Sequence, residues 1–170
     1  MRNAFPENKG RRKLIQIAVV GMGQSLRGDD AIGLEVLRKW VEKFPETASQ
    51  PGVRFEACEF PGISLLDMLQ EVDAAIFIDA IQGPFAPGTV HLIEEGQLTA
   101  FLSDAKSAHG WGLAETLRIG TTLTGIKIKV KVIGIQLEQT TFGARLSKSV
   151  SNAIPLACEI LQQEVNELLG

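Results

Sequence analysis

The sequence contains no tyrosine and only two cysteines, Cys58 and Cys158, in 170 residues. A disulfide scaffold or a structural zinc site needs more cysteines at shorter spacings, so both are excluded. Because each cysteine lies in a hydrophobic segment, we expect two buried, unreactive thiols rather than nucleophiles. Such cysteine usage fits the reducing conditions of the cytoplasm.

Long hydrophobic runs are also missing. None approaches the roughly 20 apolar residues that a membrane-spanning helix requires, and the N-terminus lacks the apolar core of a secretion signal. The formal charge is only -3, and acids and bases are interspersed after the first fourteen residues. We therefore expect a soluble cytoplasmic protein with no membrane and no nucleic-acid partner.

The composition is that of a globular protein, with 45% hydrophobic and 22% charged residues. The basic segment 1–13 is predicted to be a flexible tail, and residues 14–170 to form a single domain. Hydrophobic periodicity predicts strands at 14–20, 53–58, 75–80, 89–93 and 126–136, and helices at 32–44, 63–69, 113–119 and 146–168. Pro155 should kink the last helix or mark its start.

Strands that alternate with helices predict an α/β fold with a mostly parallel sheet covered on both faces. Ligands of such sheets bind outside the carboxyl ends of the strands. Three ionisable residues are expected there: Asp30 after the first strand, Asp79 at the end of a buried strand, and His109 in a glycine-containing loop. Two carboxylates and an imidazole suit a divalent metal such as nickel or zinc and leave coordination positions open.

Each of these residues also has a structural explanation when it is taken alone. Asp29 and Asp30 suit a helix start, where a carboxylate accepts backbone N–H bonds, and we assign Asp29 that role. An acid such as Asp79 often fixes the loop after its strand, and a histidine beside glycines, such as His109, is often a turn residue.

The pair Gly21-x-Gly23 after the first strand raises a third possibility, a nucleotide or other small-molecule site. The third glycine of a dinucleotide-binding loop would fall at Leu26, however. Asp29 and Asp30 would then repel the phosphates at the helix entrance. A dinucleotide is therefore the weaker interpretation.

Taken together, the segments resemble the hydrogenase maturation protease family from Leu14 to the last helix. Five blocks carry the resemblance in order: Gly21-Met22-Gly23-Gln24-Ser25-Leu26-Arg27-Gly28-Asp29-Asp30-Ala31-Ile32-Gly33, Phe77-Ile78-Asp79-Ala80 with Pro87-Gly88-Thr89, Ser107-Ala108-His109, Val132-Ile133-Gly134-Ile135-Gln136, and Leu146-Ser147. The sequence departs from the family pattern at Gln24, where asparagine is usual, and at Ala31, where glycine is common.

The resemblance implies a three-layer α/β/α sandwich around a twisted sheet of about five strands. It also implies an endopeptidase of the aspartyl type, with Asp30, Asp79 and His109 as both catalytic and metal-contacting residues. The implied metal is nickel supplied by the substrate, for which zinc or cadmium can substitute in crystals, and no organic cofactor is implied. The implied partner is a nickel-iron hydrogenase large-subunit precursor, which would lose its C-terminal extension after nickel insertion.

Two further questions stay open at the level of sequence. The same three residues would serve a non-catalytic maturation checkpoint or chaperone that binds nickel-loaded precursor without cutting it. In an enzyme, the metal could polarise the scissile carbonyl or activate a water molecule. The candidates for an apolar surface that docks the precursor at the rim are Leu26, Phe60, Ile81, Phe85 and Trp111, and core packing is the alternative explanation for each of them.

Overall fold

The computed structural model of the chain describes residues 14–60, 63–94, 96–97, 100, 106–107 and 128–170. The strands are β1 (Ile17–Met22), β2 (Val53–Cys58), β3 (Ala74–Gln82), β4 (Val90–Glu94), β5 (Lys106–Ser107) and β6 (Lys129–Gln136). The helices are the 3-10 turn η1 (Gly28–Ala31), α1 (Ile32–Lys43), α2 (Pro45–Ala48), α3 (Ile63–Met68) and α6 (Lys148–Leu169). The predicted tail at 1–13 and the predicted helix at 113–119 lie outside the described residues.

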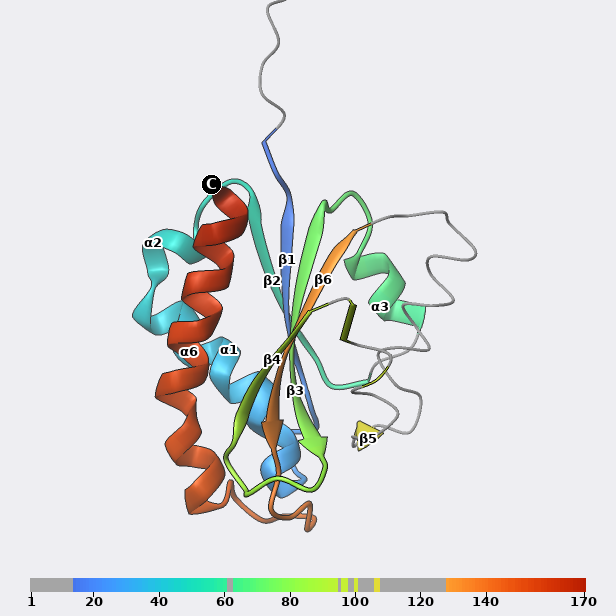
Figure 1. Cartoon of the computed structure of the whole chain (residues 1–170), viewed down its shortest axis with the longest axis vertical. Helices are drawn as coiled ribbons and strands as arrows, with labels where there is room; N and C mark the ends of the chain where they lie inside the picture. Colours follow the sequence, from blue (N-terminus) through green and yellow to red (C-terminus); the bar gives the residue numbers. More distant parts are fainter. Residues whose placement is uncertain (1–13, 61–62, 95, 98–99, 101–105, 108–127) are drawn as a thin grey trace, which may run out of the picture.

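The strands form one sheet in the order β2-β1-β3-β6-β4, with the short β5 beside the end of β3. β1 pairs in parallel with β2 and β3, and β3 with β6. β4 and β5 are antiparallel to their neighbours. The predicted mostly parallel sheet is confirmed, and β1, β3 and β6 end at the lower edge in Figure 1.

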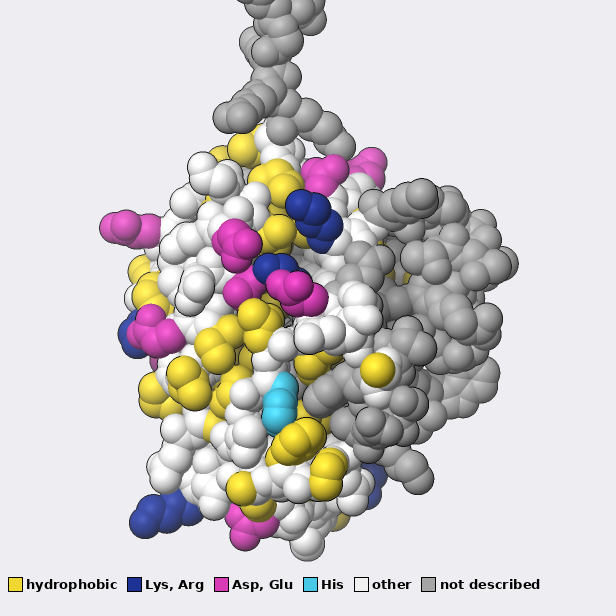
Figure 2. Space-filling model, viewed as in Figure 1, with side chains coloured by type: hydrophobic (Ala, Val, Ile, Leu, Met, Phe, Trp, Pro, Cys, Tyr) yellow, Lys and Arg dark blue, Asp and Glu magenta, His cyan; other side chains and the backbone are white. Residues whose placement is uncertain are grey.

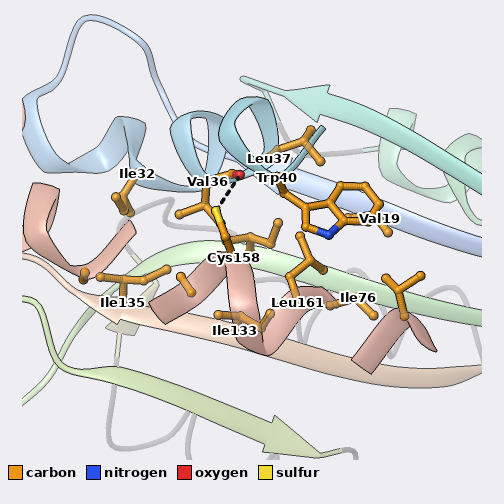
Figure 3. Close-up of a cluster of buried hydrophobic side chains, with 14 of the residues drawn as sticks. Val19, Ile32, Val36, Leu37, Trp40, Ile76, Ile133, Ile135, Cys158 and Leu161 are labelled. Carbon is orange, nitrogen blue, oxygen red and sulfur yellow. Dashed lines mark hydrogen bonds between the residues drawn. The ribbon is translucent and has the colours of Figure 1, made fainter. Parts of the chain in front are cut away.

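Helices cover both faces of this sheet, as Figure 1 shows, with α1 and α6 on one face and α3 on the other. Trp40 of α1 and Leu161 of α6 pack with strand residues such as Ile76 in the first hydrophobic cluster (Figure 3). Leu65 of α3 packs with Phe77 of β3 in the second. The predicted α/β/α sandwich is thus confirmed.

The two central strands are apolar along nearly their whole length because both of their faces are covered. Every residue of β1 is buried, and so are the first eight of β3. The one acid among them is Asp79, which is only 3% exposed. A carboxylate inside so apolar a strand carries a desolvation cost and therefore calls for a specific explanation.

The predicted boundaries of the first strand and the predicted start of the last helix were wrong. β1 begins at Ile17 and extends to Met22 because pairing with β2 and β3 continues through Gly21. The last helix begins at Lys148, where the Ser147 side chain accepts a hydrogen bond from Val150 N, and it continues through Pro155. Pro155 therefore does not mark the start of α6.

A mostly buried ion pair joins the sheet to α6. Lys131 of β6 contacts Glu164 of α6, and the two side chains are 15% and 5% exposed. Burial acts to lower the pKa of Lys131, but its hydrogen bond to Glu164 and that carboxylate's charge outweigh it, so the pKa is raised. Glu94 and Glu167 lie at 3.8 and 3.7 Å from the same ammonium group.

None of the helices in the described part of the chain is long and apolar enough to cross a membrane.

Candidate active site

The structure places two of the three predicted site residues, and both are acids. Asp30 lies in η1, between β1 and α1, and is 3% exposed. Asp79 lies near the carboxyl end of β3 and is equally buried. His109 lies outside the described residues, and so does Trp111.

The loop after β1 closes tightly around Asp30. The backbone N–H of Gln24 donates a 3.1 Å hydrogen bond to Oδ2 of Asp30. Gly23 has a φ of +146°, and an added Cβ would lie 2.0 Å from the Asp30 carbonyl oxygen. Glycine is therefore required at 23 because the loop folds back onto η1, which gives the residue a purpose without a bound phosphate. The structure also shows that residue 24 reaches Asp30 through its backbone.

Asp79 reaches the same end of the sheet. Its neighbour Ile78 pairs with Gly21 of β1, directly before the loop that leads to Asp30. An added Cβ at Gly33 would lie 2.2 Å from the Met22 carbonyl oxygen and 2.3 Å from that of Ile78. The start of α1 therefore presses against the ends of β1 and β3, and η1 contacts β3. The predicted convergence of Asp30 and Asp79 on one rim is what the structure shows.

Cys58 lies beside this pair. The Gly23 N–H donates a 3.2 Å hydrogen bond to the Cys58 carbonyl oxygen at the end of β2. Burial raises the pKa of the Cys58 thiol, and the negative charge of Asp79 raises it further. A thiol held protonated in this way is a poor nucleophile. The expectation of buried thiols is confirmed for Cys58 and also for Cys158, which is 2% exposed.

Within the described residues, no three histidine, cysteine or acidic side chains are grouped so that they could hold a metal ion. The acid pair accounts for two of the three predicted ligands. The position predicted for the third ligand, His109, falls in the segment 108–127, of which the structure gives no description.

Asp29, the neighbour of Asp30, has a structural role, as predicted, but not at its own helix. Its carboxylate accepts backbone hydrogen bonds from Glu138 at 2.9 Å, Gln139 at 3.0 Å and Ser147 at 2.6 Å. Asp29 is fully buried. Charge-assisted bonds of this kind are strong, so Asp29 fixes the segment between β6 and α6 against η1.

That segment forms one side of a groove that the sequence did not reveal. The groove has a volume of 510 Å³ and runs between residues 25–31 on one side and residues 143–151 on the other. Gly28 and Ala31, which flank the two acids in η1, are part of its wall. The groove therefore begins beside Asp30. Its position at the carboxyl end of β6 is the only feature that sequence reasoning could have used to find it.

The apolar residues considered for a docking surface differ in their exposure. Leu26, Phe60 and Phe85 are 60%, 76% and 42% exposed, as a docking surface requires. Ile81 is only 2% exposed because its side chain packs over Gly134 of β6, so core packing, the alternative explanation, is the one that holds for it. Phe142, which is 74% exposed, was missed. Hydrophobic side chains gather on the lower half of the face in Figure 2, toward the strand ends.

The fold of this chain is similar to that of solved protein structures. The hydrogenase maturating endopeptidase HybD of E. coli superposes with a TM-score of 0.78 at 25% identity, over 90% of this chain and 93% of that one. The fold is thus that of an α/β endopeptidase.

Sequence comparison gives the family. The hydrogenase maturation protease family model matches residues 61–164. A putative hydrogenase maturation protease of Methanocaldococcus jannaschii is 30% identical over 156 residues, 89% of this chain and 97% of that protein. The hydrogenase expression/formation protein HupD of Rhodobacter capsulatus is 28% identical over 90% of this chain and 71% of its own length. The chain belongs to the hydrogenase maturation protease family and is a hydrolase.

Proposed function

We propose that this enzyme removes the C-terminal extension of a nickel-iron hydrogenase large-subunit precursor once nickel has been inserted. The observation that carries the proposal is that Asp30 and Asp79, two nearly buried acids from separate segments, lie at the same end of the sheet. Membership of a protease family favours cleavage over a checkpoint that only binds the precursor. The two buried cysteines, unpaired with each other, support a cytoplasmic location.

In this proposal the nickel ion belongs to the substrate. Asp30 and Asp79 supply carboxylate oxygens, and His109 supplies an imidazole nitrogen, a donor set that suits nickel or zinc. Coordination of nickel by these side chains places the scissile peptide bond against the strand ends, so positioning is the main catalytic effect. Nickel then polarises the scissile carbonyl or activates the attacking water, and both roles need the same three ligands.

The structure supports a fixed orientation for one of these ligands. Oδ2 of Asp30 is held by the Gln24 N–H, and the loop that carries this donor is anchored to β2 through the hydrogen bond from Gly23 to Cys58. Asp79 is held by a central strand with hydrogen-bonded neighbours on both sides. Ligands on such supports keep their geometry when the substrate arrives.

The test mixes the purified chain with nickel-loaded and with nickel-free precursor and follows precursor mass by mass spectrometry. We expect loss of a C-terminal peptide only with nickel present, and loss of cleavage by roughly a hundredfold or more in Asp30→Asn and in Asp79→Asn. Asp67→Asn, at an exposed acid of α3, is the matched control and should cleave normally. A stable complex with no mass loss would instead establish the checkpoint.

A structure of crystals soaked in nickel, zinc or cadmium tests the ligand set separately from cleavage. We expect one ion in contact with Asp30, Asp79 and His109. An ion bound elsewhere, with none between the two acids, would overturn the assignment of these residues to the metal.

A further inference from the structure

The groove beside η1 is a cavity to which the proposed reaction assigns no role. It lies between the loop after β1 and the loop that joins β6 to α6. The two loops are connected directly, because the Gly143 N–H donates a 2.8 Å hydrogen bond to the Leu26 carbonyl oxygen. The groove is therefore a fixed feature of the fold rather than a gap between independent loops.

Several interactions hold the far wall in place. The Gln139 side chain donates a 3.1 Å hydrogen bond to the Arg145 carbonyl oxygen and accepts one of 2.8 Å from Thr141 N. Asp29 binds the backbone at Gln139 and at Ser147, on either side of this turn. A wall held at both ends can bind a flexible chain without first being ordered itself.

The charged side chains that line the groove indicate which kind of ligand it can bind. Glu35, on the α1 side, is engaged by Arg38 at 2.7 Å. Arg145, on the opposite side, is exposed, and no ion pair links it to any residue within the described parts of the chain. Apolar surface flanks the groove at Leu26, which lines it, and at the adjacent Phe142. An extended peptide that carries a carboxylate and an apolar side chain matches this surface.

We propose that the groove binds the substrate peptide next to the scissile bond, and that Arg145 pairs with a carboxylate of that peptide. The inference rests on the proposed function, because the peptide that must pass Asp30 is then a segment of the precursor. Gly28 and Ala31 form the wall of the groove on either side of the acids, so a peptide leaving the metal site enters it directly. The carboxylate is either an acidic side chain or the C-terminal carboxylate of the extension.

Two substitutions test the groove with neighbouring residues as controls. Ser151 lines the groove, whereas Asn152 beside it on α6 does not, and both are exposed. We expect Ser151→Trp to raise the KM for nickel-loaded precursor on the order of tenfold, with kcat nearly unchanged. Asn152→Trp should change KM by less than about twofold. Equal KM values for the two variants would overturn the assignment of the groove.

The role of Arg145 is tested by charge reversal. Arg145→Glu should weaken binding of a fluorescein-labelled synthetic peptide of the precursor's C-terminal region by roughly fivefold or more, measured by fluorescence anisotropy. Lys148→Glu makes the same charge change outside the groove and should bind normally. If the partner of Arg145 is an acidic side chain, replacing the peptide's acids by lysine should restore binding to Arg145→Glu. Unchanged binding by Arg145→Glu would overturn the pairing.

Two modified peptides distinguish the sources of the carboxylate. A peptide with an amidated C-terminus loses affinity if Arg145 binds the terminal carboxylate, and one with Asn and Gln in place of its acids loses affinity if Arg145 binds a side chain. Full affinity of both peptides overturns the pairing. If the unsubstituted enzyme does not cut the precursor, the proposed function fails; if it does and Ser151→Trp behaves as Asn152→Trp, only the groove inference fails.

Discussion

The carboxylate of Asp29 accepts a 2.6 Å hydrogen bond from the backbone N–H of Ser147, a residue 118 positions later in the chain. Ser147 is also the N-cap of α6. One buried side chain therefore connects the turn before α1 to the start of α6. Of these two adjacent acids, Asp29 has a role in the fold, and Asp30 is the one to which the proposed function gives a role in the reaction.

Replacement of Asp29 tests this connection. Asp29→Ala leaves the partly buried N–H groups of Glu138, Gln139 and Ser147 without their acceptor, so we expect the free energy of unfolding to fall by about 3 kcal/mol or more. Urea denaturation measures the change. Asp67→Ala, at an exposed acid, should lie within about 0.5 kcal/mol of the parent chain. A loss below about 1 kcal/mol for Asp29→Ala would contradict the structural role.

Gly33→Ala tests how closely α1 approaches the sheet. The new Cβ would meet two backbone carbonyl oxygens, at 2.2 and 2.3 Å, and neither can rotate away. We expect a loss of stability of roughly 3 kcal/mol, or failure to accumulate as folded protein. Gly96→Ala is the control, because nothing lies within 4 Å of an added Cβ there. Thermal unfolding and the folded yield of both variants would decide the matter.

Thiol chemistry should be slow in the native state. Burial raises the pKa of both Cys58 and Cys158. We therefore expect Ellman's reagent to react fully only after unfolding in urea, and iodoacetamide to leave precursor cleavage intact. Rapid inactivation by a thiol reagent would point to a cysteine nucleophile instead of the acid pair.

The same shifts predict a pH effect. A raised pKa means that the native state keeps its thiol protons at a pH where the unfolded chain releases them. Stability is therefore complete below the pKa of the unfolded thiol, about 8.5, and falls as the pH rises above it. Cys158→Ala should reduce this alkaline loss in denaturation measured across the range. If the free energy of unfolding falls equally steeply with rising pH in the parent chain and in Cys158→Ala, the prediction is contradicted.

Lys131→Met tests the ion pair between β6 and α6. Removal of the ammonium group leaves Glu164, whose side chain is 5% exposed, as an uncompensated buried charge. We expect a loss of about 3 kcal/mol, largely recovered when Glu164→Leu is added. Lys43→Met breaks the pair with Glu159, whose two side chains are 50% and 57% exposed, and should cost less than about 1 kcal/mol.

The position of Asp30 and Asp79 at the same end of the sheet was predictable from the sequence because the carboxyl ends of parallel strands share one edge of a sheet. An acid just after one buried strand and an acid at the end of another must then lie at that edge. The hydrogen bonds of Asp29 were not predictable in the same way. Their partners lie 109 to 118 residues away and donate through the backbone, which carries no sequence signal.

The groove was missed for a related reason. Its outer wall is a loop without a recognisable motif, and its shape depends on which residues of that loop bind Asp29. Boundaries differed where strand pairing outweighs local preference. Gly21 suggests a turn, yet it lies inside β1 and is tightly packed, since an added Cβ would lie 2.6 Å from the Gly33 carbonyl oxygen. Local propensity gives way to tertiary contacts at such positions.

Asp29 and Asp30 are adjacent in the short turn η1, so neither can move without the other. A rotation that reoriented Asp30 would also pull Asp29 away from the three backbone N–H groups that it binds. In the proposed function, Asp30 is therefore held in place before the precursor arrives, and docking free energy is not consumed in aligning it. Substitutions that weaken the loop between β6 and α6 should consequently slow the chemical step, even when the proposed metal ligands Asp30, Asp79 and His109 are unchanged.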